Sequence, residues 1–87
     1  MSIDEIRERV ITLLEEICEV DSEKILVEYQ TYGDAEIDSV YFYEIIGVLE
    51  AELGTKVSDK MLKEVHKRVK SSFSEFCNLW LEMQGGD

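Results

Sequence analysis

Apolar side chains recur every three to four residues over four stretches of the chain, and this spacing predicts four helices. The first helix begins at a capping box formed by Ser2 and Glu5 and ends near Cys18 or Glu19. Its apolar stripe consists of Ile3, Ile6, Val10, Leu13, Leu14 and Ile17. The remaining positions are mostly polar, so this helix is expected to bury one face only.

The second predicted helix begins near Asp38 or Ser39, and Gly54 is placed to end it as the first residue beyond its C-cap. Its broad apolar stripe consists of Phe42, Ile45, Ile46, Leu49 and Leu53. A narrower strip on another side consists of Val40, Tyr43 and Gly47, with the acids Glu44 and Glu50 at its borders. An apolar strip with acidic borders is typical of a helix that binds a partner, but it also fits ordinary surface variation, and both interpretations stay open.

The last third of the chain carries two more predicted helices. Ser58 caps the first of them, and a second capping box, Ser72 with Glu75, opens the other. Their apolar positions are Met61, Leu62, Val65 and Val69 in the third helix, and Phe73, Phe76, Cys77, Leu79 and Trp80 in the fourth.

Residues 26–37 show no sustained period and are predicted to form a long loop, after a short turn over residues 21–25. Leu26, Tyr29 and Tyr32 are expected to hold this loop against the helices. No stretch alternates between apolar and polar residues for long enough to predict a strand. The expected fold is therefore all-α, a four-helix bundle with a long loop between the first and second helices.

The chain is strongly and unevenly acidic. Its net charge is −11 over 87 residues, a length that predicts one domain over residues 1–87, with residues 82–87 as a flexible tail. Residues 1–54 contain 15 acidic and 3 basic residues, whereas the remainder is nearly balanced. This charge argues against nucleic acid as a partner and favours partner proteins with basic patches. No apolar run is long enough for a membrane span and no targeting segment is recognisable, so we expect a cytoplasmic monomer.

Asp38 and Ser39 form the candidate chemical site, where an acidic loop gives way to the second helix. No histidine or second catalytic group accompanies the serine, so an enzyme is not expected, and a plain helix cap is the simplest alternative. An anion bonded to the Ser39 hydroxyl would lie at the positive end of the helix dipole. We therefore interpret Ser39 as an attachment point for a phosphate-containing prosthetic group.

Neither a metal site nor a reactive cysteine is predicted. The segment Asp34–Ile45 has carboxylates at its first, third and fifth positions, as a calcium loop does, but it lacks the glycine and the final glutamate of such a loop. Cys18 and Cys77 are isolated within apolar helical patterns, so both are expected to be core thiols.

The second helix and its flanks resemble the acyl carrier proteins and the related peptidyl and alanyl carrier domains. That family opens the helix with a Gly-x-Asp-Ser-Leu type of motif, and this chain reads Glu36-Ile37-Asp38-Ser39-Val40, followed by Glu44-Ile45-Ile46 and Leu49-Glu50. The similarity extends outward from Ile11 to Asp59. It implies a bundle of the acyl-carrier type and a 4′-phosphopantetheine group attached to Ser39 by a separate phosphopantetheinyl transferase.

The resemblance also implies roles for neighbouring residues. Asp38 would assist the transferase chemistry and its metal. Partner recognition would use Val40, Glu44 and Glu50, with the strip residues Tyr43 and Gly47 beside them. An acyl pocket would be lined by Ile46, Leu49, Val57, Leu62 and Val65. The partners would be the transferase and acyl- or aminoacyl-transferring enzymes with basic docking patches.

The implied function is that of an acyl carrier protein, which carries acyl groups as thioesters to enzymes of lipid, fatty acid or related specialised biosynthesis. Aminoacyl, peptidyl and polyketide cargo are alternatives, and so is an unmodified acidic protein-interaction module. The chain departs from the family pattern at Ala35, Glu36, Val40 and Ser58, where leucine, glycine, leucine and proline are usual. These departures favour a carrier dedicated to one pathway over a housekeeping member.

Overall fold

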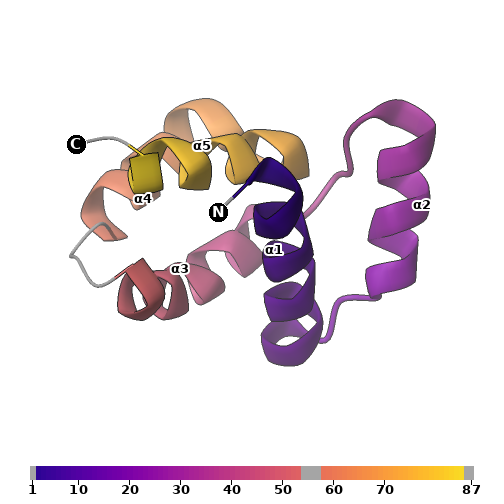
Figure 1. Ribbon diagram of the computed structural model, residues 1–87, viewed down its shortest axis with the longest axis horizontal. Helices are drawn as coiled ribbons and strands as arrows, with labels where there is room; N and C mark the ends of the chain where they lie inside the picture. The colour runs from indigo at the N-terminus through magenta and orange to yellow at the C-terminus, as the bar shows by residue number, and fades with distance from the viewer. Residues whose placement is uncertain (1, 54–57, 86–87) are drawn as a thin grey trace.

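The computed structural model describes residues 2–53 and 58–85, and it is helical almost throughout (Figure 1). Its elements are α1 (Ile3–Cys18), α2 (Ser22–Tyr32), α3 (Ser39–Leu53), α4 (Ser58–Glu64), the π-helical turn η1 (Val65–Val69) and α5 (Phe73–Gly85). These residues contain no strand, only an isolated bridge between Glu36 and Ser72. The all-α prediction is confirmed, and all four predicted helices are present, the third as α4 continued by η1.

The start of α1 follows from its sequence. The Ser2 hydroxyl accepts the Glu5 N–H at 3.2 Å, and the Glu5 carboxylate accepts the Ser2 N–H at 2.9 Å, which completes the predicted capping box. At the other end Glu19 adopts the left-handed conformation, with φ 58°, and donates its N–H to the Glu15 carbonyl. The chain turns there towards α2.

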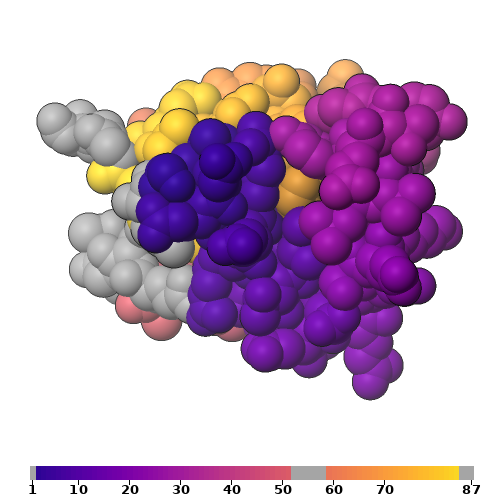
Figure 2. Space-filling view, turned by 45° about the vertical axis from the view of Figure 1, so that its right-hand side comes forward, coloured from indigo at the N-terminus to yellow at the C-terminus, as the bar shows by residue number. Residues whose placement is uncertain are grey.

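The predicted long loop between the first two helices is wrong, because most of it folds as α2. The Asp21 carboxylate caps this helix by accepting the Glu23 N–H at 3.0 Å, and Gly33 ends it with φ 77° while donating its N–H to the Tyr29 carbonyl. Only Ile25 of α2 is buried, since the helix lies at the side of the molecule beside α1 (Figures 1 and 2). A helix with so narrow a buried side leaves little apolar period in its sequence.

Of the three side chains expected to hold this segment against the body, only Tyr29 does so. Its ring lies edge-on to that of Phe73, with 5.8 Å between the centroids, and the Arg7 guanidinium lies 5.0 Å from the Tyr29 ring centroid. Leu26 and Tyr32 point outward, with 44% and 79% of their surface exposed. The contact between α2 and the body therefore depends on Ile25 and Tyr29.

The apolar faces of α1, α3, η1 and α5 meet in one core. Phe42 of α3 stacks on Phe76 of α5, with 4.4 Å between ring centroids and 6° between ring planes. Around this ring pair the following residues of the core are also buried: Ile6, Val10, Leu13, Leu14, Ile45, Ile46, Leu49, Met61, Val65, Val69, Phe73, Cys77, Leu79 and Trp80. No polar or charged residue of the described part of the chain is buried with them.

The chain between α4 and α5 turns through η1. The Lys70 N–H donates to the Val65 carbonyl at 2.7 Å, and this wider turn keeps Val65 and Val69 both buried. The flexible tail predicted from residue 82 is wrong for residues 82–85, because α5 extends to Gly85. Within that stretch the Glu82 carboxylate accepts a bond of 2.8 Å from the Arg68 guanidinium, and Met83 packs against the core. Residues 86–87 lie outside the described residues.

Trp80 provides a test of this core. Its side chain is fully buried, and its indole N–H has no hydrogen-bond partner in the described structure. We expect Trp80→Ala to lower the free energy of unfolding by about 3–5 kcal/mol. Trp80→Phe should cost much less, because it keeps most of the packing and removes no hydrogen bond. Urea denaturation followed by circular dichroism measures both, and equal losses for the two variants would contradict this account of the core.

Candidate functional site

Ser39 is the first residue of α3, and its side chain is half-buried. The preceding residue, Asp38, performs the capping: its Oδ1 accepts the Val40 N–H at 3.1 Å, and its carbonyl accepts the Tyr41 N–H at 3.0 Å. The Ser39 hydroxyl makes no hydrogen bond to another described residue. The plain-cap alternative therefore applies to Asp38, and the Ser39 oxygen is left available for chemistry.

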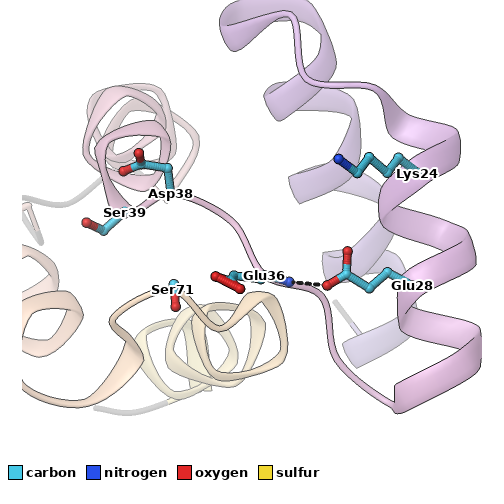
Figure 3. Close-up of a pocket in the computed structure, with 6 residues that line it drawn as sticks. All are labelled: Lys24, Glu28, Glu36, Asp38, Ser39 and Ser71. Carbon is cyan, nitrogen blue, oxygen red and sulfur yellow. Dashed lines mark hydrogen bonds between the residues drawn. The ribbon is translucent and has the colours of Figure 1, made fainter.

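The Ser39 side chain lines a hollow of about 540 Å³ between α2, the segment that leads into α3, and the chain before α5 (Figure 3). Its walls are formed by Lys24, Glu28, Glu36, Asp38, Ser39 and Ser71. Three carboxylates and one ammonium group thus surround the serine. Sequence reasoning identified Asp38 and Ser39 but missed Lys24, Glu28 and Ser71 as their neighbours.

Backbone pairing holds the segment before Ser39 in place. The Ile37 N–H donates to the Ser71 carbonyl at 2.8 Å, and the Phe73 N–H donates to the Ala35 carbonyl at 3.0 Å. The side chains of Ala35 and Ile37, the two residues that make these bonds, are buried, with 2% and 4% of their surface exposed. The approach to α3 is therefore a rigid segment and not a freely moving loop.

The Asp34 carboxylate reinforces this pairing from the α5 side. It accepts the Ser72 hydroxyl at 2.6 Å and the backbone N–H groups of Ser74 and Ala35, both at 2.8 Å. Partial burial raises the pKa of Asp34, but the bonds from Ser72, Ser74 and Ala35 outweigh this effect and hold the pKa below its usual value. Asp34 thus joins the end of α2 to the start of α5.

The predicted capping box at the start of α5 is only half present. The Glu75 N–H donates to the Ser72 hydroxyl at 3.1 Å, as predicted. The Ser72 N–H, however, donates to the Val69 carbonyl at 2.9 Å, so the Glu75 side chain is not needed there. Asp34 supplies the second capping group instead, because its Oδ1 accepts the Ser74 N–H. That contact spans forty residues of sequence and could not be read from local spacing.

A second bond connects α2 to the approach segment. The Glu28 Oε1 accepts the Glu36 N–H at 2.9 Å, drawn as the dashed line in Figure 3. The signal that could have placed Glu28 and Lys24 on a helix was the pair of end residues, Asp21 as an N-cap and Gly33 as the residue that ends the helix.

The predicted recognition strip lies on the surface of α3. Val40 and Tyr43 are 46% and 37% exposed, and a Cβ built at Gly47 would meet no atom within 4 Å. Glu44 is exposed and its carboxylate accepts a hydrogen bond of 3.1 Å from the Cys18 thiol, whereas Glu50 is half-buried. The recognition role of these residues stays a prediction, on a surface that is open to a partner.

The residues predicted to line an acyl pocket are not grouped around Ser39. Ile46, Leu49 and Val65 are buried in the core, and Leu62 is 39% exposed. Val57 lies outside the described residues. None of the four described side chains lines the hollow beside Ser39. The acyl pocket stays a prediction.

Neither cysteine is poised as a nucleophile. Burial, with the Glu44 carboxylate beside it, raises the pKa of Cys18 to about 12, and deeper burial raises the pKa of Cys77 to about 12. Within residues 2–53 and 58–85, no group of three or more His, Cys, Asp or Glu side chains is arranged to hold a metal ion. No described helix is long and apolar enough to cross a membrane.

Comparison with known families adds one finding. A family model described as the phosphopantetheine attachment site matches residues 8–71. The matched range contains Asp38, Ser39 and every other residue that lines the hollow. No curated protein and no solved structure gave a significant match.

The Asp34 contacts predict a specific pH dependence. Since the pKa of Asp34 is lowered in the folded protein, its contribution to stability is complete above about pH 4 and is lost as the pH falls through the folded pKa. We expect Asp34→Asn to lower the free energy of unfolding by about 1–2 kcal/mol at pH 7, a range reduced for partial exposure. The difference from wild type should shrink below about pH 4.

Denaturant titrations from pH 7 to pH 2 measure this difference. Asp59→Asn, at an exposed position in α4, is the matched control and should leave the pH profile of wild type unchanged. A constant difference between Asp34→Asn and wild type at every pH would contradict the proposed role of the charged carboxylate.

Proposed function

The chain belongs to the family of phosphopantetheine attachment-site domains, and from this premise we propose that it is an acyl carrier protein whose prosthetic group is bonded to Ser39. One observation, more than any other, supports Ser39 as the attachment residue. Ser39 lines the hollow and its hydroxyl makes no hydrogen bond to other described residues, while Asp38 caps the start of α3.

The residues around Ser39 fit a covalently attached phosphate. Ser39 lines an open hollow, the helix start beside it favours negative charge, and Lys24 lines the same hollow together with three carboxylates. The 4′-phosphopantetheine group of this family supplies a flexible arm whose terminal thiol forms thioesters with acyl groups. Cys18 and Cys77, with pKa values of about 12, do not supply such a thiol.

Attachment requires a partner, because Ser39 has no general base of its own. A phosphopantetheinyl transferase would transfer the group from coenzyme A: the Ser39 oxygen forms a new bond to phosphorus, the phosphoanhydride bond breaks with adenosine 3′,5′-bisphosphate as the leaving group, and the transferase takes the hydroxyl proton. The exposed Asp38 carboxylate uses one oxygen to cap α3. Its other oxygen takes no part in that bond, which fits the role of assisting the metal of the transferase.

We further propose that the cargo is an acyl group of a lipid, fatty acid or related specialised pathway. Two of the departures from the family pattern, Ala35 and Glu36, lie in the segment paired with residues 71–73. The small Ala35 is buried in this pairing, and Glu36 lines the hollow. At Glu36 the surface beside the serine therefore differs from the usual family pattern where a partner enzyme would meet it, which supports a carrier dedicated to one pathway.

Attachment is tested by the intact mass of the protein after incubation with coenzyme A, Mg²⁺ and a broad-specificity transferase. We expect wild type to gain one phosphopantetheine group and Ser39→Ala to gain none, because the variant lacks the accepting oxygen. Ser71→Ala is the matched control, since Ser71 lines the same hollow. An unmodified wild type would support the interaction-module alternative, and a modified Ser39→Ala protein would place the attachment elsewhere.

Docking is tested by removing charge from the borders of the α3 strip. We expect the double variant Glu44→Gln, Glu50→Gln to associate with the transferase about tenfold more slowly at low ionic strength, because acidic steering is lost. The rates should converge at high salt. Glu8→Gln, Glu16→Gln on α1 makes the same change in net charge at exposed positions and should slow association much less. Equal rates for the two double variants would refute docking through α3.

A further inference from the structure

The outward side of α2 exposes apolar side chains that the core does not use. No other element covers this side of the helix in Figure 2. In the described part of the chain, eight large apolar side chains are exposed, and five of them lie on α2 or on the first two turns of α3. These five are Leu26, Val27, Tyr32, Val40 and Tyr43. Exposed apolar surface is therefore concentrated on the two helices that meet at the candidate attachment site, a distribution typical of an interaction surface.

The apolar surface of α2 adjoins the hollow beside Ser39. Val27 and Tyr32, which are 58% and 79% exposed, line a shallow hollow of about 540 Å³ on α2. This hollow shares Lys24 and Glu28 with the one beside Ser39. Tyr32 also lines a third hollow of about 380 Å³, which shares three wall residues with the Ser39 hollow. A protein that covers Ser39 would therefore meet Tyr32 at its edge.

The apolar surface has an acidic border. Asp21, Glu23 and Glu28 line the hollow on α2 with Lys24 as the single cation, and three carboxylates with the same lysine line the hollow beside Ser39. Carboxylates repel the phosphates of coenzyme A, so an enzyme that brings coenzyme A to this place must bring cationic groups with it. The surface is thus complementary to a protein that presents apolar side chains with a basic border.

We propose that Val27 and Tyr32 with their acidic border, here named the α2 face, dock the phosphopantetheinyl transferase while it acts on Ser39. This inference rests on the proposed function, and it adds a second helix to the α3 strip as a docking surface. The transferase is the partner that fits best, because it must bring its own active site to bonding distance of the Ser39 oxygen. Enzymes that act later on the cargo meet the far end of a flexible arm.

The size of a protein interface supports this assignment. A stable interface covers about 800 Å² on each partner, which corresponds to a disc about 16 Å in radius. The 11 residues of α2 span about 17 Å, and two of them line the hollow beside Ser39. A transferase centred on Ser39 would therefore cover much of α2 as well as the start of α3.

Tyr32 is the expected anchor of the α2 face. Tyrosine is enriched among the residues that dominate interface energies, since its ring buries a large area while its hydroxyl stays at the wet rim. Val27 offers a smaller apolar area. Neither side chain lines the hollow around Ser39, so their loss should weaken docking and leave the transfer step unchanged.

The test measures the rate of attachment against carrier concentration, by intact mass, with coenzyme A, Mg²⁺ and a broad-specificity transferase. Tyr32→Ser should raise KM for the carrier about fivefold and Val27→Ser about twofold, with kcat unchanged. Tyr32→Phe should stay close to wild type, because it keeps the ring. Leu81→Ser is the control: Leu81 lies on α5, is 37% exposed, and lines none of these three hollows. Circular dichroism of each variant confirms that the fold is unchanged.

Three outcomes would overturn docking through the α2 face and leave the carrier function intact. One is that Tyr32→Ser has no more effect on KM than Leu81→Ser. Another is a fall in kcat with KM unchanged, which would mean that Tyr32 acts on the serine and not on docking. The third is a wild-type dimer in sedimentation velocity that Tyr32→Ser dissociates, which would assign the α2 face to a second copy of the chain. A wild type that never accepts the prosthetic group would overturn the proposed function as well.

Discussion

The Asp34 carboxylate is the contact on which the site depends. It binds Ser72 and Ser74 at the start of α5 and directs the chain that follows it into the pairing of residues 35–37 with residues 71–73. A carboxylate that accepts several N–H and O–H donors is held in one geometry. Because Asp38 follows directly after this pairing, the position of Ser39 is set by α5, an element distant in sequence.

The helix α2 forms one wall of the hollow beside the start of α3. Without it, Ser39 would face solvent beside Asp38 alone, as a serine at any helix start does. The capping bonds at Asp21 and Gly33 fold this segment as a helix, and Ile25 and Tyr29 attach it to the body. Lys24 and Glu28, which lie one turn apart on α2, then line the hollow. The candidate site is thus formed by α2, the start of α3, the segment that connects them, and Ser71.

Charged side chains gather at two places around α3. The strip on α3, with Glu44 and Glu50 at its borders, faces outward and suits fast association with basic partner surfaces. The hollow beside Ser39 is lined by the carboxylates of Glu28, Glu36 and Asp38 together with the Lys24 ammonium group. Neither the half-buried Cys18 nor the buried Cys77 lines the hollow.

Helical periodicity by itself determined the all-α fold, the positions of α1, α3, α4 with η1, and α5, and the Asp38–Ser39 dipeptide at a helix start, because these features depend on neighbours three or four residues apart. It could not reveal α2, whose single buried residue leaves almost no period. The cap of α5 by Asp34 and the closeness of Lys24 and Ser71 to Ser39 were decided only by the tertiary structure. These contacts join residues far apart in the chain, and their geometry exists only once the core has packed the helices together.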